Sequence, residues 1–95
     1  MTKTKLVRTV IVTNPQGLHA RPADLFVKLA QQYRSQVEVS KESLRVDGKS
    51  ILDILMLAAV EGTPLAIEVT GDDAQDALDA LCRLVEQNFA DDLNP

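Results

Sequence analysis

The chain has 95 residues, and at this length one small domain with a single core is expected over residues 1–95. Only 3% of the residues are aromatic while 45% are hydrophobic, so we expect an aliphatic core. The single cysteine, Cys82, excludes an intrachain disulfide, and its separation from the only histidine argues against a metal site. Without a signal segment or an apolar run that spans a bilayer, the chain is expected to be cytoplasmic, with no membrane insertion.

The charge is unevenly distributed about a net value of −4. Residues 1–49 hold nine Lys and Arg against four Asp and Glu, whereas residues 50–95 hold one Arg against ten acids. Neither a run of basic residues nor a set of aromatic side chains for base stacking accompanies the basic half. We therefore expect an acidic protein partner and no nucleic acid.

The first half of the chain alternates between strand and helix patterns. Residues 6–13 alternate apolar and polar positions, apart from Arg8, and predict a strand. The next four residues, 14–17, fit a type I turn because Pro follows Asn and Gly ends the turn. A helix is predicted over 19–32. Its core stripe consists of Phe26, Leu29, Ala30 and Tyr33.

Two short alternating segments follow, at 36–40 and 44–46, and they predict a hairpin. The side chains expected to face inward are those of Val37, Val39, Leu44 and Val46. Another helix is predicted over 51–60, with Ser50 as its N-cap and Asp53 in capping-box spacing. Because this helix is apolar on every face, part of it should stay exposed as a docking surface for a partner.

The last strand is predicted at 65–70 and the last helix after Gly71. The stripe of that helix consists of Ala74, Ala77, Leu78, Leu81, Val85 and Phe89. Cys82 lies beside the stripe and is expected to pack there, because no basic group is predicted close to it. Residues 90–95 are expected to fray. The order βαββαβα predicts an α+β open-faced sandwich, with one four-stranded antiparallel sheet and three helices on one face.

Residues 14–23, with the sequence NPQGLHARPA, carry the only histidine. Pro22 is tolerated in the first turn of a helix, so the helix places His19 and Arg21 beside unpaired N–H groups and the positive end of the helix dipole. This arrangement attracts phosphate. An imidazole nitrogen can accept a phosphoryl group, and a guanidinium neutralises the incoming charge. The plainer interpretation is a polar N-cap beside a solvated arginine.

The segment GLHARPA at residues 17–23 resembles the active-site signature of HPr, the histidine phosphocarrier of the bacterial phosphotransferase system. The resemblance covers nearly the whole chain, because Lys49-Ser50-Ile51 before an apolar helix also matches HPr in order and spacing. It implies the same βαββαβα fold. It also implies that His19 takes a phosphoryl group on Nδ1 from phosphorylated enzyme I and passes it to an enzyme IIA, while Arg21 steadies that group.

The same resemblance implies that Ser50 is a regulatory phosphorylation site for an HPr kinase/phosphorylase, with a transcriptional regulator as a further partner. The implied docking residues are Ala20, Lys28, Lys49, Ile51, Leu52 and Leu55. A carrier of this kind needs no cofactor, is a substrate of enzyme I and not an enzyme, and is expected to be a monomer.

Three departures from the HPr pattern leave the branch of the family open. Asp24 places an acid near the docking face, Ala58 replaces a glycine of the sugar-transport branch, and the acidic end is longer. A nitrogen-branch or regulation-only paralogue is therefore an alternative, as is a binding module that acts mainly through Ser50. A small-ligand-binding α/β sandwich of similar topology is a further alternative, which should show an apolar pocket.

Overall fold

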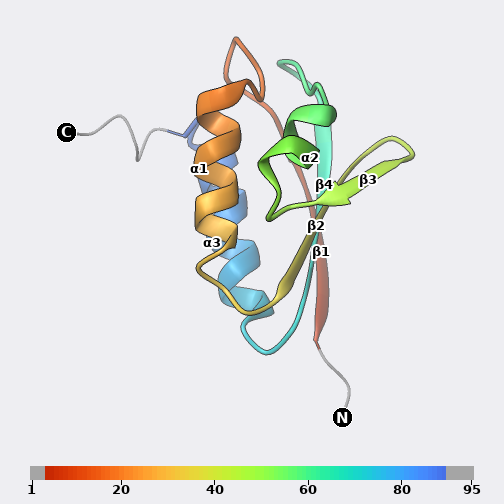
Figure 1. The fold of residues 1–95 in the computed structure, drawn as a ribbon, viewed down its shortest axis with the longest axis vertical. Helices are drawn as coiled ribbons and strands as arrows, with labels where there is room; N and C mark the ends of the chain where they lie inside the picture. The colour runs from red at the N-terminus through yellow and green to blue at the C-terminus, as the bar shows by residue number, and fades with distance from the viewer. Residues whose placement is uncertain (1–3, 90–95) are drawn as a thin grey trace, which may run out of the picture.

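The computed structural model of the chain describes residues 4–89 (Figure 1). The elements follow in the predicted order βαββαβα. They are β1 (Lys5–Ile11), α1 (Ala20–Ala30), β2 (Gln36–Lys41), β3 (Leu44–Asp47), α2 (Ile51–Met56), β4 (Pro64–Thr70) and α3 (Ala74–Glu86).

The four strands form one sheet in the order β1-β4-β2-β3, and every neighbouring pair is antiparallel. Figure 1 shows all three helices on one side of this sheet. The register places Val10 opposite Leu65 and Val39 opposite Ile67, and all four side chains are buried under the helices. The predicted open-faced sandwich is confirmed.

The opposite face of the sheet carries a cluster of charged side chains. The Arg45 guanidinium contacts the Glu38 carboxylate at 2.8 Å and the Glu68 carboxylate at 3.2 Å, and Lys5 Nζ lies 3.5 Å from Glu68. Glu38 and Glu68 are direct cross-strand neighbours, so the two cations offset a like-charge pair.

One predicted core residue is exposed. Leu44, expected to face inward with Val46, keeps 41% of its surface accessible, whereas Val46 keeps 7%. Leu44 pairs with Lys41 at the end of the β2–β3 ladder, and Figure 1 shows this hairpin projecting beyond the helices. The alternation is correct, but no helix reaches the tip of the hairpin among residues 4–89.

The predicted helix over 51–60 is too long, because α2 ends at Met56. Lys41 Nζ donates a hydrogen bond to the Leu57 carbonyl at 2.9 Å, and Ala58 then adopts a φ of +48°. Glycine is favoured in this left-handed region, and Ala58 stands where the sugar-transport branch was expected to have one. Tertiary contacts therefore end this helix.

The capping box forms only in part. The Ser50 hydroxyl accepts the Asp53 N–H at 3.3 Å, as predicted. The Asp53 carboxylate, however, accepts the Asp47 N–H at 3.1 Å, and the Ser50 N–H donates to the Asp47 carbonyl at 3.2 Å. Aspartate is one methylene shorter than the glutamate of an ordinary capping box, and here its carboxylate binds the end of β3 instead.

Cys82 is fully buried in α3, as predicted, but its surroundings are not those expected. A basic group does lie close, because the Arg8 guanidinium interacts with the thiol while it is paired with Asp79 at 3.0 Å. Burial outweighs this effect and raises the pKa of the Cys82 thiol.

The expectation of frayed residues 90–95 falls outside the described residues. No helix of residues 4–89 is long and apolar enough to cross a bilayer.

Candidate functional site

The turn before the histidine closes as predicted. The Gly17 N–H donates to the Asn14 carbonyl at 3.0 Å, and the Asn14 side-chain amide donates back to the Gly17 carbonyl. Gly17 adopts a φ of +71°, a conformation that glycine takes without strain. Two bonds thus fix the ends of this turn to each other.

The turn is also held against the segment that follows α2. The Leu18 N–H donates to the Ala59 carbonyl at 2.9 Å. A Cβ at Gly17 would lie only 2.4 Å from the same oxygen, so any other residue would push the turn away. The start of α1 and the end of α2, distant in sequence, are thereby fixed side by side (Figure 1).

His19 is the N-cap of α1, and its side chain is exposed. Its carbonyl accepts the Ala23 N–H at 3.0 Å, which is the first bond of the helix. Within the described chain, its side chain makes no capping hydrogen bond, unlike a serine or an aspartate in this position. The plainer interpretation of a polar cap therefore does not describe this imidazole, which remains available for chemistry.

Arg21 is exposed two residues further on, in the first turn of α1. A cavity of about 250 Å³ lies beside this turn. Its lining consists of Asn14, His19, Arg21, Pro22, Leu25, Asn88 and Phe89. The helix start therefore offers N–H groups, a guanidinium and an imidazole around one small space, which suits a phosphoryl group.

Sequence reasoning missed the contribution of Asn88 and Phe89 to this cavity. Both residues adopt a positive φ after α3, which turns the chain back, and the Phe89 N–H donates to the Leu84 carbonyl at 2.9 Å. The Thr13 hydroxyl lies 3.4 Å from the Asn88 side-chain oxygen, next to the histidine turn. The stripe of α3 predicted the burial of Phe89, but it carried no signal for this reversal.

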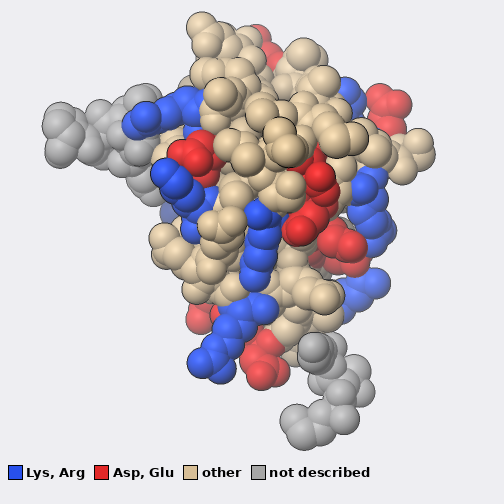
Figure 2. Space-filling model, in the orientation of Figure 1, with Lys and Arg blue, Asp and Glu red and all other residues tan. Residues whose placement is uncertain are grey.

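An apolar surface lies on α2 and the residues after it, close to His19. Leu52 is 72% exposed and Leu55 is 36% exposed, whereas Ile51 is partly buried against the core. Met56 and Val60, which the sequence analysis did not single out, are 63% and 64% exposed. Figure 2 shows that the surface over α2 and the neighbouring loops carries few charged side chains. We name Leu52, Leu55, Met56 and Val60 the α2 patch.

The cations expected near this surface are partly engaged. Lys28 forms an ion pair with Asp24 at 3.1 Å along α1, and Lys49 Nζ donates to the Tyr33 carbonyl at 2.7 Å. Ala20, the first residue of α1, is exposed. Asp24, a departure from the HPr pattern, thus reduces the charge that Lys28 presents.

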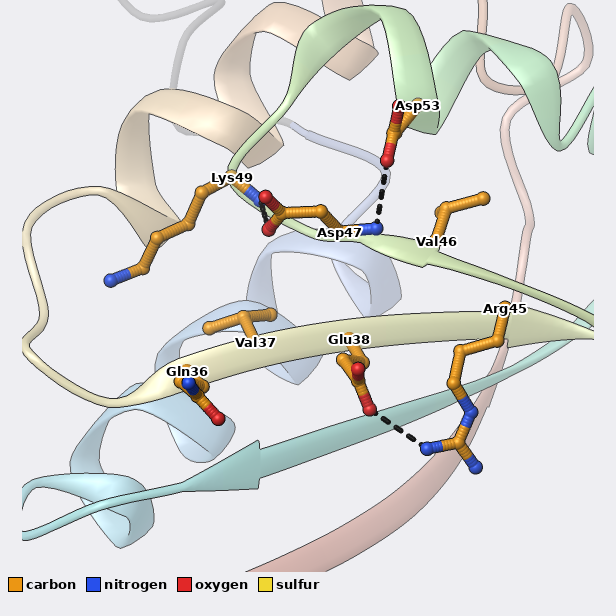
Figure 3. Close-up of a pocket in the computed structure, with 8 residues that line it drawn as sticks. All are labelled: Gln36, Val37, Glu38, Arg45, Val46, Asp47, Lys49 and Asp53. Carbon is orange, nitrogen blue, oxygen red and sulfur yellow. Dashed lines mark hydrogen bonds and ion pairs between the residues drawn. The ribbon is translucent and has the colours of Figure 1, made fainter.

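A second cavity, of about 490 Å³, lies between β2, β3 and the start of α2 (Figure 3). The charged side chains in its lining are already paired: Arg45 binds Glu38, the Asp47 carboxylate accepts the Lys49 N–H at 2.9 Å, and the Asp53 carboxylate accepts the Asp47 N–H. His19 and Arg21 are not part of it. The smaller cavity is the one that His19 and Arg21 line.

The family model described as PTS HPr component phosphorylation site matches residues 6–87, and this range contains the whole histidine turn. The chain belongs to the HPr family. The phosphocarrier protein HPr of Neisseria meningitidis serogroup B is 40% identical over 86 residues, which cover 90% of this chain and 97% of the relative. HPr is the phosphocarrier of the phosphotransferase system, which confirms the resemblance seen in the sequence.

Solved HPr structures share the fold. An HPr structure from Thermoanaerobacter tengcongensis gives a TM-score of 0.87 at 39% identity, covering 90% of this chain and 96% of the other. Crh of Bacillus subtilis, a catabolite repression protein, gives a TM-score of 0.72 at 38% identity, and the match covers 83% of this chain and 91% of the Crh chain. Crh is a swapped, intertwined dimer in its crystal.

Proposed function

We propose that this HPr carries a phosphoryl group on His19, taken in the cytoplasm from phosphorylated enzyme I and passed to an enzyme IIA. The observation that carries the proposal is the exposed imidazole of His19 at the N-cap of α1, beside Arg21. We further propose that the carrier acts as a monomer and, as a substrate of enzyme I, catalyses no reaction of its own.

The transfer needs a lone pair, charge neutralisation and positioning. A lone pair on the His19 ring attacks phosphorus, a nitrogen–phosphorus bond forms, and the bond from phosphorus to the donor breaks with its electron pair. By resemblance to HPr the attacking atom is Nδ1. The Arg21 guanidinium then offsets the charge on the phosphoryl oxygens, which the N–H groups at the start of α1 also receive.

Mass spectrometry tests this assignment. After incubation with enzyme I and phosphoenolpyruvate, the wild-type chain should gain one acid-labile phosphoryl group, and His19→Ala should gain none. The exposed position of His19 predicts that this variant melts near the wild-type temperature, so lost labelling would not reflect unfolding. Acid-labile labelling of His19→Ala would refute the proposal.

The contribution of Arg21 to phosphoryl transfer can be measured as a change in the transfer rate. Because its guanidinium is proposed to stabilise charge in the transition state, Arg21→Ala should slow phosphoryl transfer to and from the carrier by about 10²-fold. Arg21→Lys keeps the charge but loses the planar guanidinium, so its transfer rate should lie between those of the wild type and Arg21→Ala. Equal rates in all three chains would leave Arg21 without a role in transfer.

We propose Ser50 as a regulatory phosphorylation site, because its hydroxyl lies at the start of α2 beside the α2 patch. The proposed partners are an HPr kinase/phosphorylase and a transcriptional regulator. The docking residues proposed for enzyme I and enzyme IIA are Ala20, Lys28, Lys49, Ile51, Leu52 and Leu55. Transfer from the phosphorylated chain to a sugar-type or a nitrogen-type enzyme IIA would separate the two branches, and transfer to neither would favour a regulation-only HPr.

A further inference from the structure

Asn14 carries a buried hydrogen-bond acceptor next to the proposed nucleophile. The residue is only 8% exposed, and its Oδ1 has no hydrogen-bond partner among residues 4–89. The Gly17 carbonyl fixes the orientation of the amide, because Nδ2 donates to it and a reversed amide would set two oxygens against each other. A buried acceptor without a donor is costly, and this one therefore requires an explanation.

Donors are available in the cavity that Asn14 lines. His19, Arg21 and Asn88 also line it, and each carries N–H groups. Arg21 is the proposed charge partner of the phosphoryl group. The side-chain oxygen of Asn88 lies 3.4 Å from the Thr13 hydroxyl oxygen. The His19 ring lines the same cavity as Asn14 and makes no capping bond within the described chain, and the torsion that turns an imidazole is broad.

We propose that Asn14 is a positioning residue for His19, whose Oδ1 accepts the N–H of the ring nitrogen that does not carry the phosphoryl group. The inference rests on the phosphocarrier function proposed above. A neutral imidazole carries one N–H and one lone pair, and the hydrogen bond made by the first decides where the second lies. Asn14 would thus hold the lone pair on the nitrogen that attacks phosphorus.

The same bond favours the product. When the lone pair forms the bond to phosphorus and the donor leaves with its own electron pair, the proton on the other ring nitrogen stays in place. The phosphorylated ring then carries a positive charge, so its N–H donates a stronger hydrogen bond to the Asn14 oxygen. An amide serves this purpose better than a carboxylate, because it adds no negative charge close to the phosphoryl oxygens.

Nitrogen-15 NMR of the ring tests the proposal on the full, unphosphorylated chain, and the single histidine makes the assignment unambiguous. In the wild type we expect one dominant tautomer. Loss of one hydrogen bond in Asn14→Leu should shift the tautomer ratio about fivefold. Asn14→Asp, which keeps an oxygen acceptor but loses the Nδ2 donor, should retain the wild-type tautomer.

The outcomes separate the two ends of the amide. If Asn14→Asp shifts the ratio as Asn14→Leu does, the bond from Nδ2 to Gly17 carries the effect and the proposal is wrong. It is also wrong if Asn88→Ala reproduces the shift, because the amide of Asn88 then acts on the ring. Should Asn14→Leu fail to fold, two equally populated tautomers in the wild type would overturn the proposal.

The lifetime of the phosphorylated histidine gives a second readout. Asn14→Leu should lose its phosphoryl group to water about fivefold faster than the wild type, while Asn14→Asp should not be faster than Asn14→Leu. If no chain accepts a phosphoryl group from enzyme I, the carrier function fails. The tautomer measurement then still decides whether Asn14 orients the ring, because it needs no phosphorylation.

Discussion

The Asp73 carboxylate binds Ser35 twice, accepting its N–H at 2.9 Å and its hydroxyl at 2.5 Å, and it also accepts the Arg34 N–H at 2.8 Å. These bonds tie the start of α3 to the connection between α1 and β2. Gly71 completes the contact, because a Cβ there would lie 2.4 Å from the Ser35 hydroxyl oxygen. The Asp73 carboxylate thus binds a segment distant in sequence, and it makes no side-chain cap for α3.

The Asp73 contacts predict a pH-dependent stability. Its hydrogen bonds, led by that from the Ser35 hydroxyl, lower the pKa of Asp73 below its ordinary value of 3.8. A lowered pKa in the folded state stabilises the fold above the ordinary value, and this stabilisation is lost as the pH falls through the folded pKa. Asp73→Asn should therefore melt below the wild type at pH 7, with the difference shrinking at lower pH. Asp72 is the exposed neighbour of Asp73, so Asp72→Asn is the matched control. Its melting temperature at pH 7 should differ less from that of the wild type.

Ala58→Gly should stabilise the protein. Alanine at the φ of +48° found for Ala58 destabilises the folded state by about 1 kcal/mol. Glycine removes this strain, but the greater freedom of glycine in the unfolded chain cancels part of the gain. We expect a net gain of about 0.5 kcal/mol, which raises the melting temperature by about 2–4 °C. In contrast, Ala80→Gly within α3 should lower stability by about 1 kcal/mol. A lower melting temperature for Ala58→Gly would show that the left-handed residue is not strained.

Features set by neighbouring residues were predictable from the sequence. The turn over 14–17 depends on proline and glycine chemistry and was predicted correctly. Helical periodicity correctly predicted the burial of Phe26 and Ala30, whereas Leu29 is only partly buried and Tyr33, also partly buried, lies beyond the end of α1. The end of α2 was not, because Lys41 and Leu18 determine it from other elements. Local patterns carry no information on such distant partners.

The candidate site divides in the same way. His19 and Arg21 share one helical turn, so the motif alone brings them together. The contributions of Asn88 and Phe89 depend on two left-handed residues after α3, which asparagine tolerates and phenylalanine rarely adopts. The buried oxygen of Asn14 is visible only once the direction of its amide is known. The part of the site formed by the local motif is therefore predictable from the sequence, whereas the part formed by the residues after α3 is not.

Cys82 should be inert in the folded protein. Its thiol is fully buried and burial raises its pKa, so the reactive thiolate is disfavoured despite the nearby Arg8. Alkylation should be slower in buffer than in concentrated urea by about 10³-fold or more, because it must wait for unfolding. Cys82→Ser provides the blank for the reagent. Rapid alkylation of the folded chain would instead indicate an accessible, activated thiol.

Leu52→Glu tests the α2 patch as a docking surface. Leu52 is 72% exposed, so a charge there should change the melting temperature by about 3 °C at most. It should raise the carrier concentration needed for half-maximal phosphorylation by enzyme I about tenfold, as loss of a central apolar contact does. Val7→Glu is the matched control, because Val7 is 56% exposed but lies on the outer face of the sheet. Equal effects of the two variants would exclude the patch as the docking surface.

Ser50→Asp tests regulation through the same surface. A negative charge at Ser50 would lie close to Asp47 and Asp53, both engaged in hydrogen bonds at this end of α2. The nearest lysine in sequence, Lys49, binds the Tyr33 carbonyl, and Figure 3 shows its ammonium directed away from Asp53. The added charge is therefore poorly neutralised within the carrier and is presented to the partner.

We expect this charge to act on association more than on folding. Against the acidic partner predicted from the charge distribution, a like charge can cost several kcal/mol, so Ser50→Asp should raise the carrier concentration for half-maximal phosphorylation of His19 about tenfold or more. Its melting temperature should stay within about 3 °C of the wild type. Ser43→Asp, on the exposed turn between β2 and β3, adds the same charge away from α2 and should leave the kinetics unchanged. If Ser43→Asp slows phosphorylation equally, net charge and not the position of Ser50 controls the encounter.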